Sequence, residues 1–248
     1  MHQRRVLDIA LIGAQKSGTT SLAALLAQHP SVCVAQNKET HLFDQHRVQQ
    51  KGLHPDDLLG HFPHREHDQV LVDATPSYLY LPGCVESLVR HNPNIRILVI
   101  LRDPAERAVS HHAHEQRLGY ERRLFLSALI LERFRLRRDH DPLAPHSAHR
   151  HFSYIDRGRY SKQLQRLSSI TPNYLVLNFS DLLTSPQETM DRVFTFLRLP
   201  SIEVRDIPHL NRRHDQPKQW QIRLARLLLR NKSQHFVPHK AAQLESVA

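Results

Sequence analysis

Residues 6–28 read VLDIALIGAQKSGTTSLAALLAQ, and this stretch decides the fold class. Val6–Ile12 is almost wholly apolar, which is typical of a buried strand in a parallel sheet. A polar turn with two glycines follows, and residues 19–28 predict a helix that ends before Pro30. A strand, a glycine turn and a helix in this order form the opening unit of an α/β fold.

The turn that starts at Gly13 has the glycine spacing of a Walker A phosphate loop, GxxxxGK[ST]. Thr19 stands where that motif requires lysine, and Lys16 comes two residues before Gly18 instead. Glycines let consecutive backbone N–H groups point at one anion, and the N-terminus of the next helix adds its positive dipole end. We therefore predict a phosphate cradle of altered chemistry, made of Gln15, Lys16, Ser17, Gly18, Thr19, Thr20 and Ser21. A chance strand–turn–helix of small residues is the alternative.

Apolar runs and helical patterns alternate along the rest of the chain. Further strands are expected at 32–35, 70–72, 95–101 and 174–178. Helices are expected near 84–91, 104–117, 121–137, 158–168 and 186–197. This alternation predicts an α/β, P-loop-like three-layer sandwich with a central parallel sheet and helices on both faces.

Two later segments stand apart from this alternation. Residues 138–152 are rich in Pro, His and charge and predict a mobile loop, a candidate lid over the site. Residues 220–230, WQIRLARLLLR, predict a basic amphipathic helix. We favour a peripheral helix that packs Ile222, Leu224 and residues 227–229 on the core over a helix that contacts a membrane.

The composition is basic: 34 Lys and Arg oppose 24 Asp and Glu, for a formal charge of +10 in 248 residues. This suggests an anionic partner, such as nucleic acid, an acidic polymer, a phosphorylated cofactor or a membrane surface, or else a solvated arginine-rich surface. A hydrophobic share of 40% argues against disorder throughout. Because no apolar run approaches roughly 18 residues and no signal peptide is evident, we expect a cytoplasmic protein. Cys33 and Cys84 form no CxxC motif and are expected to be reduced.

A second anion site is predicted where the strand at 95–101 ends. Arg102 follows that strand directly, at the edge where parallel sheets bind ligands. Ser110 lies about two turns into the helix that begins at Pro104. The cation and the hydroxyl can converge on one anion, although an ordinary strand–helix corner with a surface arginine would look the same.

The two pieces together, QKSGTTSL at 15–22 and RDPAERAVS at 102–110, resemble the sulfotransferase superfamily that uses 3′-phosphoadenosine 5′-phosphosulfate (PAPS). Further segments are similar to its heparan-sulfate-type branch: NKETHLF at 37–43, DATPSY at 73–78 and GRY at 158–160. Ala74 departs from that branch, some members of which carry a lysine there. The resemblance spans roughly residues 6–200 and points to a bacterial-type relative. It implies a domain over 1–205 and a basic helical tail over 206–248.

The resemblance implies sulfuryl transfer from PAPS to a hydroxyl or amine, with a saccharide among the candidate acceptors. The first loop would hold the 5′-phosphosulfate, and Lys16 would stabilise the leaving phosphate. Glu39 would be the general base, and His41 and His114 would lie near the acceptor. On the cofactor side, the 3′-phosphate and adenine would be held by Arg102, Ser110, Tyr160, Arg212 and Arg213.

Three other functions remain open on the sequence. A P-loop kinase or NTPase would carry lysine where this chain has Thr19. No Walker B aspartate is evident either, so no metal site is expected. A basic nucleic-acid-binding module has no recognisable motif behind it. A cofactor-binding protein without turnover is the third alternative. No motif in the variable loops identifies the acceptor.

Overall fold

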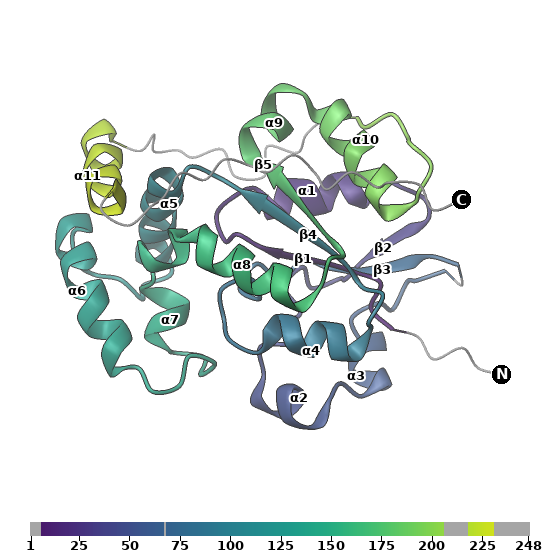
Figure 1. Ribbon diagram of the computed structural model, residues 1–248, viewed down its shortest axis with the longest axis horizontal. Coiled ribbons are helices and arrows are strands. Elements are labelled where there is room, and N and C mark those ends of the chain that lie inside the picture. The colour runs from purple at the N-terminus through teal and green to yellow at the C-terminus, as the bar shows by residue number, and fades with distance from the viewer. Residues whose placement is uncertain (1–5, 67, 206–217, 231–248) are drawn as a thin grey trace.

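A computed structural model describes residues 6–66, 68–205 and 218–230 (Figure 1). Five strands form one sheet in the order β2-β3-β1-β4-β5, and every pairing is parallel. The strands are β1 (Ile9–Gly13), β2 (Val32–Val34), β3 (Val70–Asp73), β4 (Arg96–Leu101) and β5 (Tyr174–Asn178). All five lie where the apolar runs placed them, so the predicted parallel α/β sheet is confirmed.

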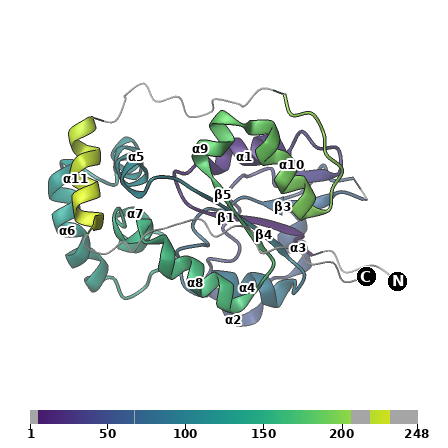
Figure 2. The same cartoon turned by 45° about the horizontal axis from the view of Figure 1, so that its top comes forward.

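Helices cover both faces of the sheet (Figures 1 and 2). Those that flank the sheet are α1 (Thr19–Leu26), α9 (Phe179–Thr184) and α10 (Pro186–Leu197) on one face, and α2 (His46–Lys51), α3 (Pro55–Leu59), α4 (Cys84–His91) and α8 (Tyr160–Ile170) on the other. Successive strand side chains point to opposite faces, so Ile9 and Leu11 pack with α1 while Ala10 and Ile12 pack with α4. Burial of both faces explains the near-continuous apolar runs.

A third cluster lies at one end of the sheet. It is built from α5 (Pro104–Arg117), α6 (Phe125–Arg138) and α11 (Gln219–Arg230), with α7 (Ala148–His151) and the 3₁₀ turn η1 (Asp156–Gly158) beside them (Figure 2). Helix α11 packs on α5 through Ile222, Ala225 and Leu229. Leu227 and Leu228 are exposed, so the expectation that residues 227–229 all pack inward was wrong for two of them. A helix buries positions three or four apart, not three in a row.

The predicted mobile loop at 138–152 differs most from the structure. It contains the helical turn α7, whose cap residue Ser147 accepts a hydrogen bond from the Arg150 backbone N–H. The Arg150 side chain then ties the segment to the body of the domain by bonds to Asp44. Helices α2, α3 and α9 were not predicted, because six residues or fewer show too little periodicity.

Smaller expectations agree with the structure. Cys33 and Cys84 are both free thiols, as predicted. Helix α8 begins at Tyr160, after η1. Gly158 packs closely against Pro104, since a Cβ at Gly158 would lie 3.2 Å from the Pro104 Cβ. Within the described residues, no helix is both long and apolar enough to cross a bilayer.

Candidate functional site

The glycine turn joins β1 to α1 at the carboxyl edge of the sheet. Gly18 has a φ of 93°, a conformation that side chains rarely adopt, and a Cβ there would lie 2.5 Å from the Phe179 ring. Lys16 also has a left-handed backbone, with a φ of 69°. The turn therefore holds a tight curl immediately before a helix N-terminus, the geometry in which backbone N–H groups collect around an anion.

The donors of this turn fit a phosphate-like group. No side chain caps the N-terminus of α1, which leaves its first N–H groups to other acceptors. Ser17 is fully buried, and its hydroxyl makes no hydrogen bond of normal geometry, although Tyr160 lies next to it. A buried hydroxyl with so poor a partner gains from a better acceptor, such as an anion bound in the turn. Thr19 is buried, and Thr20 and Ser21 are half-buried beside it.

Gln15 links this turn to a buried cation. The Arg157 guanidinium donates to Gln15 Oε1 over 2.6 Å, and it also donates to Ser153 and to the His149 carbonyl. Arg157 lies over the Tyr80 ring, and its side chain is 1% exposed. Burial lowers the pKa of Arg157 to about 10, which leaves it charged at neutral pH. The turn is therefore held from one side by a fixed positive charge that the sequence did not reveal.

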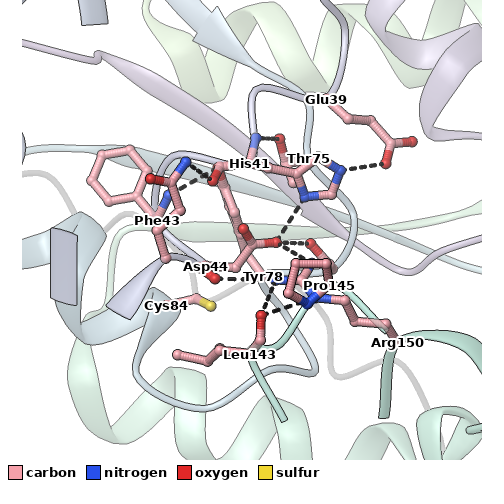
Figure 3. Close-up of polar contacts among 12 residues, drawn as sticks. Glu39, His41, Phe43, Asp44, Thr75, Tyr78, Cys84, Leu143, Pro145 and Arg150 are labelled. Carbon is pink, nitrogen blue, oxygen red and sulfur yellow. Dashed lines mark hydrogen bonds and ion pairs between the residues drawn. The ribbon is translucent and has the colours of Figure 1, made fainter. Parts of the chain in front are cut away.

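Glu39 and His41 are brought together in a chain of charged groups (Figure 3). His41 Nε2 lies 3.5 Å from Glu39 Oε2, and His41 Nδ1 lies 2.8 Å from Asp44 Oδ2. Asp44 is buried, and the same oxygen accepts from Ser77 at 2.8 Å and from Arg150 at 2.9 Å. We call Glu39, His41 and Asp44 the relay. Its outer carboxylate, Glu39, is 41% exposed, whereas its inner one is enclosed.

The protonation of the relay follows from these contacts. Burial opposes the charge on His41, but its bonds with Asp44 and Glu39 outweigh this and raise the pKa of His41 to about 9. Burial likewise disfavours the Asp44 carboxylate, yet His41 and Arg150 lower the pKa of Asp44 to about 2. The pKa of Glu39 is lowered in spite of desolvation, by His41 and Lys38. At neutral pH the relay is therefore an imidazolium between two carboxylates, and Glu39 is ionised and able to accept a proton.

The turn that carries the relay is fixed from the end of β3. The Thr40 hydroxyl donates to Asp73 Oδ2 over 2.7 Å, and the Tyr78 hydroxyl donates to the same oxygen over 2.9 Å. Tyr78 in turn accepts from the Phe43 backbone N–H, and Thr75 accepts from that of Thr40. Asp73 and Tyr78 are thus buried supports of the relay turn.

A cleft of about 740 Å³ opens beside the relay. Gln15, Glu39, His41 and His114 all line it, so one hollow joins the glycine turn to the relay. His114 accepts a hydrogen bond from Arg117 over 2.9 Å. Burial, with the nearby charge of Lys16, lowers the pKa of His114, which makes it a neutral group at this wall. The structure therefore brings Glu39, His41 and His114 to one cleft, and their catalytic roles stay predictions.

Arg102 and Ser110 lie outside that cleft. Arg102 donates twice to Glu106, at 2.9 and 3.1 Å, and lies over the Phe179 ring. Ser110 is buried one turn beyond Glu106 on the same face of α5. The Tyr160 hydroxyl donates to the Arg102 carbonyl over 3.0 Å. These groups form a second polar corner, while the predicted residues Arg212 and Arg213 lie outside the described residues.

Sequence reasoning missed Asp44, Arg150 and Arg157. Asp44 follows His41 by three residues, so a longer reading of the 37–43 segment would have included it. Arg150 lies 106 residues from Asp44, in a segment interpreted as a mobile loop, and carried no local signal. Arg157 directly precedes the GRY segment but lies 142 residues from Gln15. Among the residues with described positions, no group of His, Cys, Asp and Glu side chains is arranged to hold a metal ion.

Comparison with known proteins places the chain in a family. A family model described as a sulfotransferase domain matches residues 7–237. A human heparan sulfate glucosamine 3-O-sulfotransferase 5 is 27% identical over 192 residues, which cover 77% of this chain and 53% of that protein. A human heparan sulfate glucosamine 3-O-sulfotransferase 6 is 31% identical over 111 residues, covering 45% of this chain and 31% of that protein. The chain therefore spans about half, or less, of the length of these curated relatives.

Solved structures agree on the fold. A sulfotransferase from Alicyclobacillus acidocaldarius superposes with a TM-score of 0.73 at 22% identity, covering 90% of this chain and 91% of that one. A sulfotransferase domain from the Synechococcus PCC 7002 olefin synthase gives a TM-score of 0.53 at 14% identity, covering 92% and 96%. At these identities the likeness concerns the arrangement of strands and helices.

Proposed function

Because the chain belongs to the sulfotransferase domain family, we propose that it transfers a sulfuryl group from PAPS to a hydroxyl or amine of an acceptor. The observation that carries this proposal is the shared cleft. A phosphate-type turn contributes Gln15 to the same hollow that the Glu39 carboxylate lines. A donor anion and a proton acceptor are thereby held at one place, as in-line displacement at a charged group requires.

We assign the two anionic ends of PAPS to two places, the glycine turn and the corner at Arg102. The buried Ser17 hydroxyl and the uncapped N-terminus of α1 suit its 5′-phosphosulfate. The corner at Arg102 and Ser110 is the candidate for its 3′-phosphate, with Tyr160 beside it; the phosphate would replace the partly exposed Glu106 carboxylate as the partner of Arg102. When bound, PAPS supplies the sulfuryl group and a phosphate leaving group. The turn then contributes fixed N–H donors and the Lys16 charge, which stabilise the leaving oxygen.

Glu39 is the proposed general base. It is ionised at neutral pH and lies on the cleft wall, so it can take the proton of an acceptor hydroxyl. The protonated His41 faces Glu39 and is itself fixed by Asp44, which sets the orientation of the outer carboxylate. The chain's own residues thus perform two tasks: the glycine turn neutralises charge on the leaving phosphate, and Glu39 accepts the proton of the acceptor.

A binding experiment tests the donor. Calorimetric titration of the purified chain with 3′,5′-adenosine bisphosphate is expected to show saturable binding, and Mg-ATP is expected to show none. Thr19 occupies the position of the Walker lysine, which argues against ATP. Binding of Mg-ATP alone would favour a kinase or NTPase and refute the proposal. Binding of the bisphosphate without sulfate transfer to any acceptor would favour a cofactor-binding protein.

The acceptor is the open part of the proposal. The curated relatives are named for transfer to a glucosamine of heparan sulfate, so a saccharide hydroxyl is one candidate. A screen with radiolabelled PAPS against saccharides, lipids and small alcohols or phenols would identify the class. The residues that line the cleft narrow the class of acceptor further.

A further inference from the structure

The cationic groups of the cleft wall are already engaged by protein atoms. Arg150 donates to Asp44 and to the carbonyls of Leu143 and Ala144, over 2.9–3.2 Å. Arg157 donates to Gln15, Ser153 and backbone carbonyls. These are the two arginines among the described residues that line the cleft. Both arginines are mostly buried, so neither offers a free guanidinium to a sulfate or carboxylate of an incoming molecule. The other cation of the wall, the protonated His41, is held between Glu39 and Asp44.

The same wall carries four carboxylates. They are Glu39, Asp44, Glu115 and Asp141. Despite its burial, Glu115 is held ionised by His111 and His151, which lower its pKa to about 2. The bond from His46 lowers the pKa of Asp141. Glu39 and Asp141 are exposed, at 41% and 48%, and place negative charge on the wall, whereas Asp44 and Glu115 are 1–2% exposed and paired with Arg150 or histidines. A polyanionic acceptor would meet like charge there without free cations in return.

The outer part of the cleft is apolar. Leu118 is 54% exposed and Tyr120 is 44% exposed, and the Tyr120 ring stacks on His151 at 3.9 Å between ring centroids. Ala144 and Pro145 also line the cleft, next to the largely buried Leu143; Leu143 and Pro145 are seen beside Arg150 in Figure 3. Exposed apolar side chains that converge on a hollow are typical of ligand sites.

We propose that the acceptor is an uncharged hydroxyl compound with an apolar portion, whose hydroxyl reaches Glu39 while the apolar portion lies against Leu118 and Tyr120. This inference rests on the proposed sulfuryl transfer and names the substrate class of the same cleft. This acceptor differs from heparan sulfate, the polyanion in the names of the curated relatives. A polyanion needs cations that are free to bind it. The cleft wall instead provides apolar surface and cations that are already bonded to protein atoms.

Three acceptors of matched chemistry test the proposal with the full chain and PAPS. They are hexyl β-glucoside, glucose, and an N-sulfated heparan oligosaccharide. We expect kcat/KM for hexyl β-glucoside to exceed that for glucose at least about tenfold, since burial of several methylene groups favours the alkyl compound. The heparan oligosaccharide is expected to be the poorest acceptor.

Each other outcome is decisive. Preference for the heparan oligosaccharide overturns the inference, and so does equal transfer to glucose and hexyl β-glucoside. Absence of transfer to hexyl β-glucoside, while 3′,5′-adenosine bisphosphate still binds, also overturns it. Failure of the bisphosphate to bind refutes the proposed sulfuryl transfer instead, so the two proposals fail in different measurements.

Variants locate the apolar portion. Leu118→Ser is expected to raise the KM for hexyl β-glucoside about three- to tenfold, with kcat and the KM for glucose little changed. The matched control is Leu124→Ser, because Leu124 is 77% exposed and does not line the cleft. Asp141→Lys adds positive charge at the wall and is expected to raise kcat/KM for the heparan oligosaccharide. An unchanged KM ratio in Leu118→Ser would contradict the placement.

Discussion

The glycine turn and the relay differ in how the chain builds them. The turn is local: its donors come from consecutive residues between β1 and α1, and the backbone conformation sets the directions of its N–H groups. The relay is assembled over long distances, since Asp44 is held by Ser77 from one segment and by Arg150 from another, 33 and 106 residues away. A site that handles an anion can be local because any helix N-terminus supplies N–H groups. A site that orients one carboxylate needs side chains that only the fold brings together.

The largest effect is expected at the outer end of the relay. Glu39→Gln removes the proton acceptor and should lower kcat by about 10²–10⁴-fold. The affinity for 3′,5′-adenosine bisphosphate should stay unchanged, because Glu39 belongs to the relay and not to the glycine turn. Steady-state kinetics and calorimetry on the same preparation check this, with the exposed Glu188→Gln on α10 as control. Wild-type turnover in Glu39→Gln would remove the base assignment.

A variant of the glycine turn should behave differently. Lys16→Ala is expected to lower kcat by about 10²–10³-fold, since it removes the charge proposed to stabilise the leaving oxygen. Unlike Glu39→Gln, it should also weaken bisphosphate binding measurably. Lys162→Ala, at an exposed position of α8, is the control. Unchanged kcat and unchanged bisphosphate affinity in Lys16→Ala would contradict the assignment of the leaving group to the glycine turn.

Asp44→Asn tests whether the inner carboxylate acts through His41. Loss of the carboxylate charge that faces the His41 imidazolium should lower kcat by about 10–10²-fold. A purely structural role would not change the titration of His41. The relay predicts that the His41 pKa, about 9 in the native chain, falls toward 6.5 in the variant. NMR titration of the imidazole measures this directly, and an unchanged His41 pKa would contradict the positioning role.

The smallest effect concerns stability against pH. The pKa of His41 is raised from 6.5 to about 9 on folding, so its contribution is complete below pH 6.5 and is lost as the pH rises through 9. Asp44 acts in the opposite direction: its pKa falls from 3.8 to about 2, so its contribution is present above pH 3.8 and is lost as the pH falls through 2. The Tm of the native chain should therefore decline between pH 6.5 and 9.5 by a few degrees more than that of His41→Gln. Equal declines would show that His41 adds no pH-dependent stability.

Much of the fold was predictable, because its signals are local. Buried parallel strands are near-continuous apolar runs, and the helices of eight or more residues were all anticipated to within a few residues of their ends. The glycine turn was predictable for the same reason, since the spacing of Gly13 and Gly18 indicates a tight turn within one short loop. Glu39, His41 and His114 came from resemblance to a family, and the structure places all three at one cleft.

The remaining features depend on contacts between distant parts of the chain. The bond from Arg157 to Gln15 joins residues 142 apart, and the docking of α11 on α5 decides which of its leucines are buried. The spacing of apolar residues shows that a helix has a buried face, but which distant segment a residue meets leaves no local pattern in the sequence.

The sequence by itself thus determined the order of the elements and the glycine turn, because backbone hydrogen bonding and hydrophobic burial act over a few residues. Only the tertiary structure decided which charges of the cleft are engaged and which surface is left for the acceptor. Those properties follow from the partner that each side chain meets across the fold.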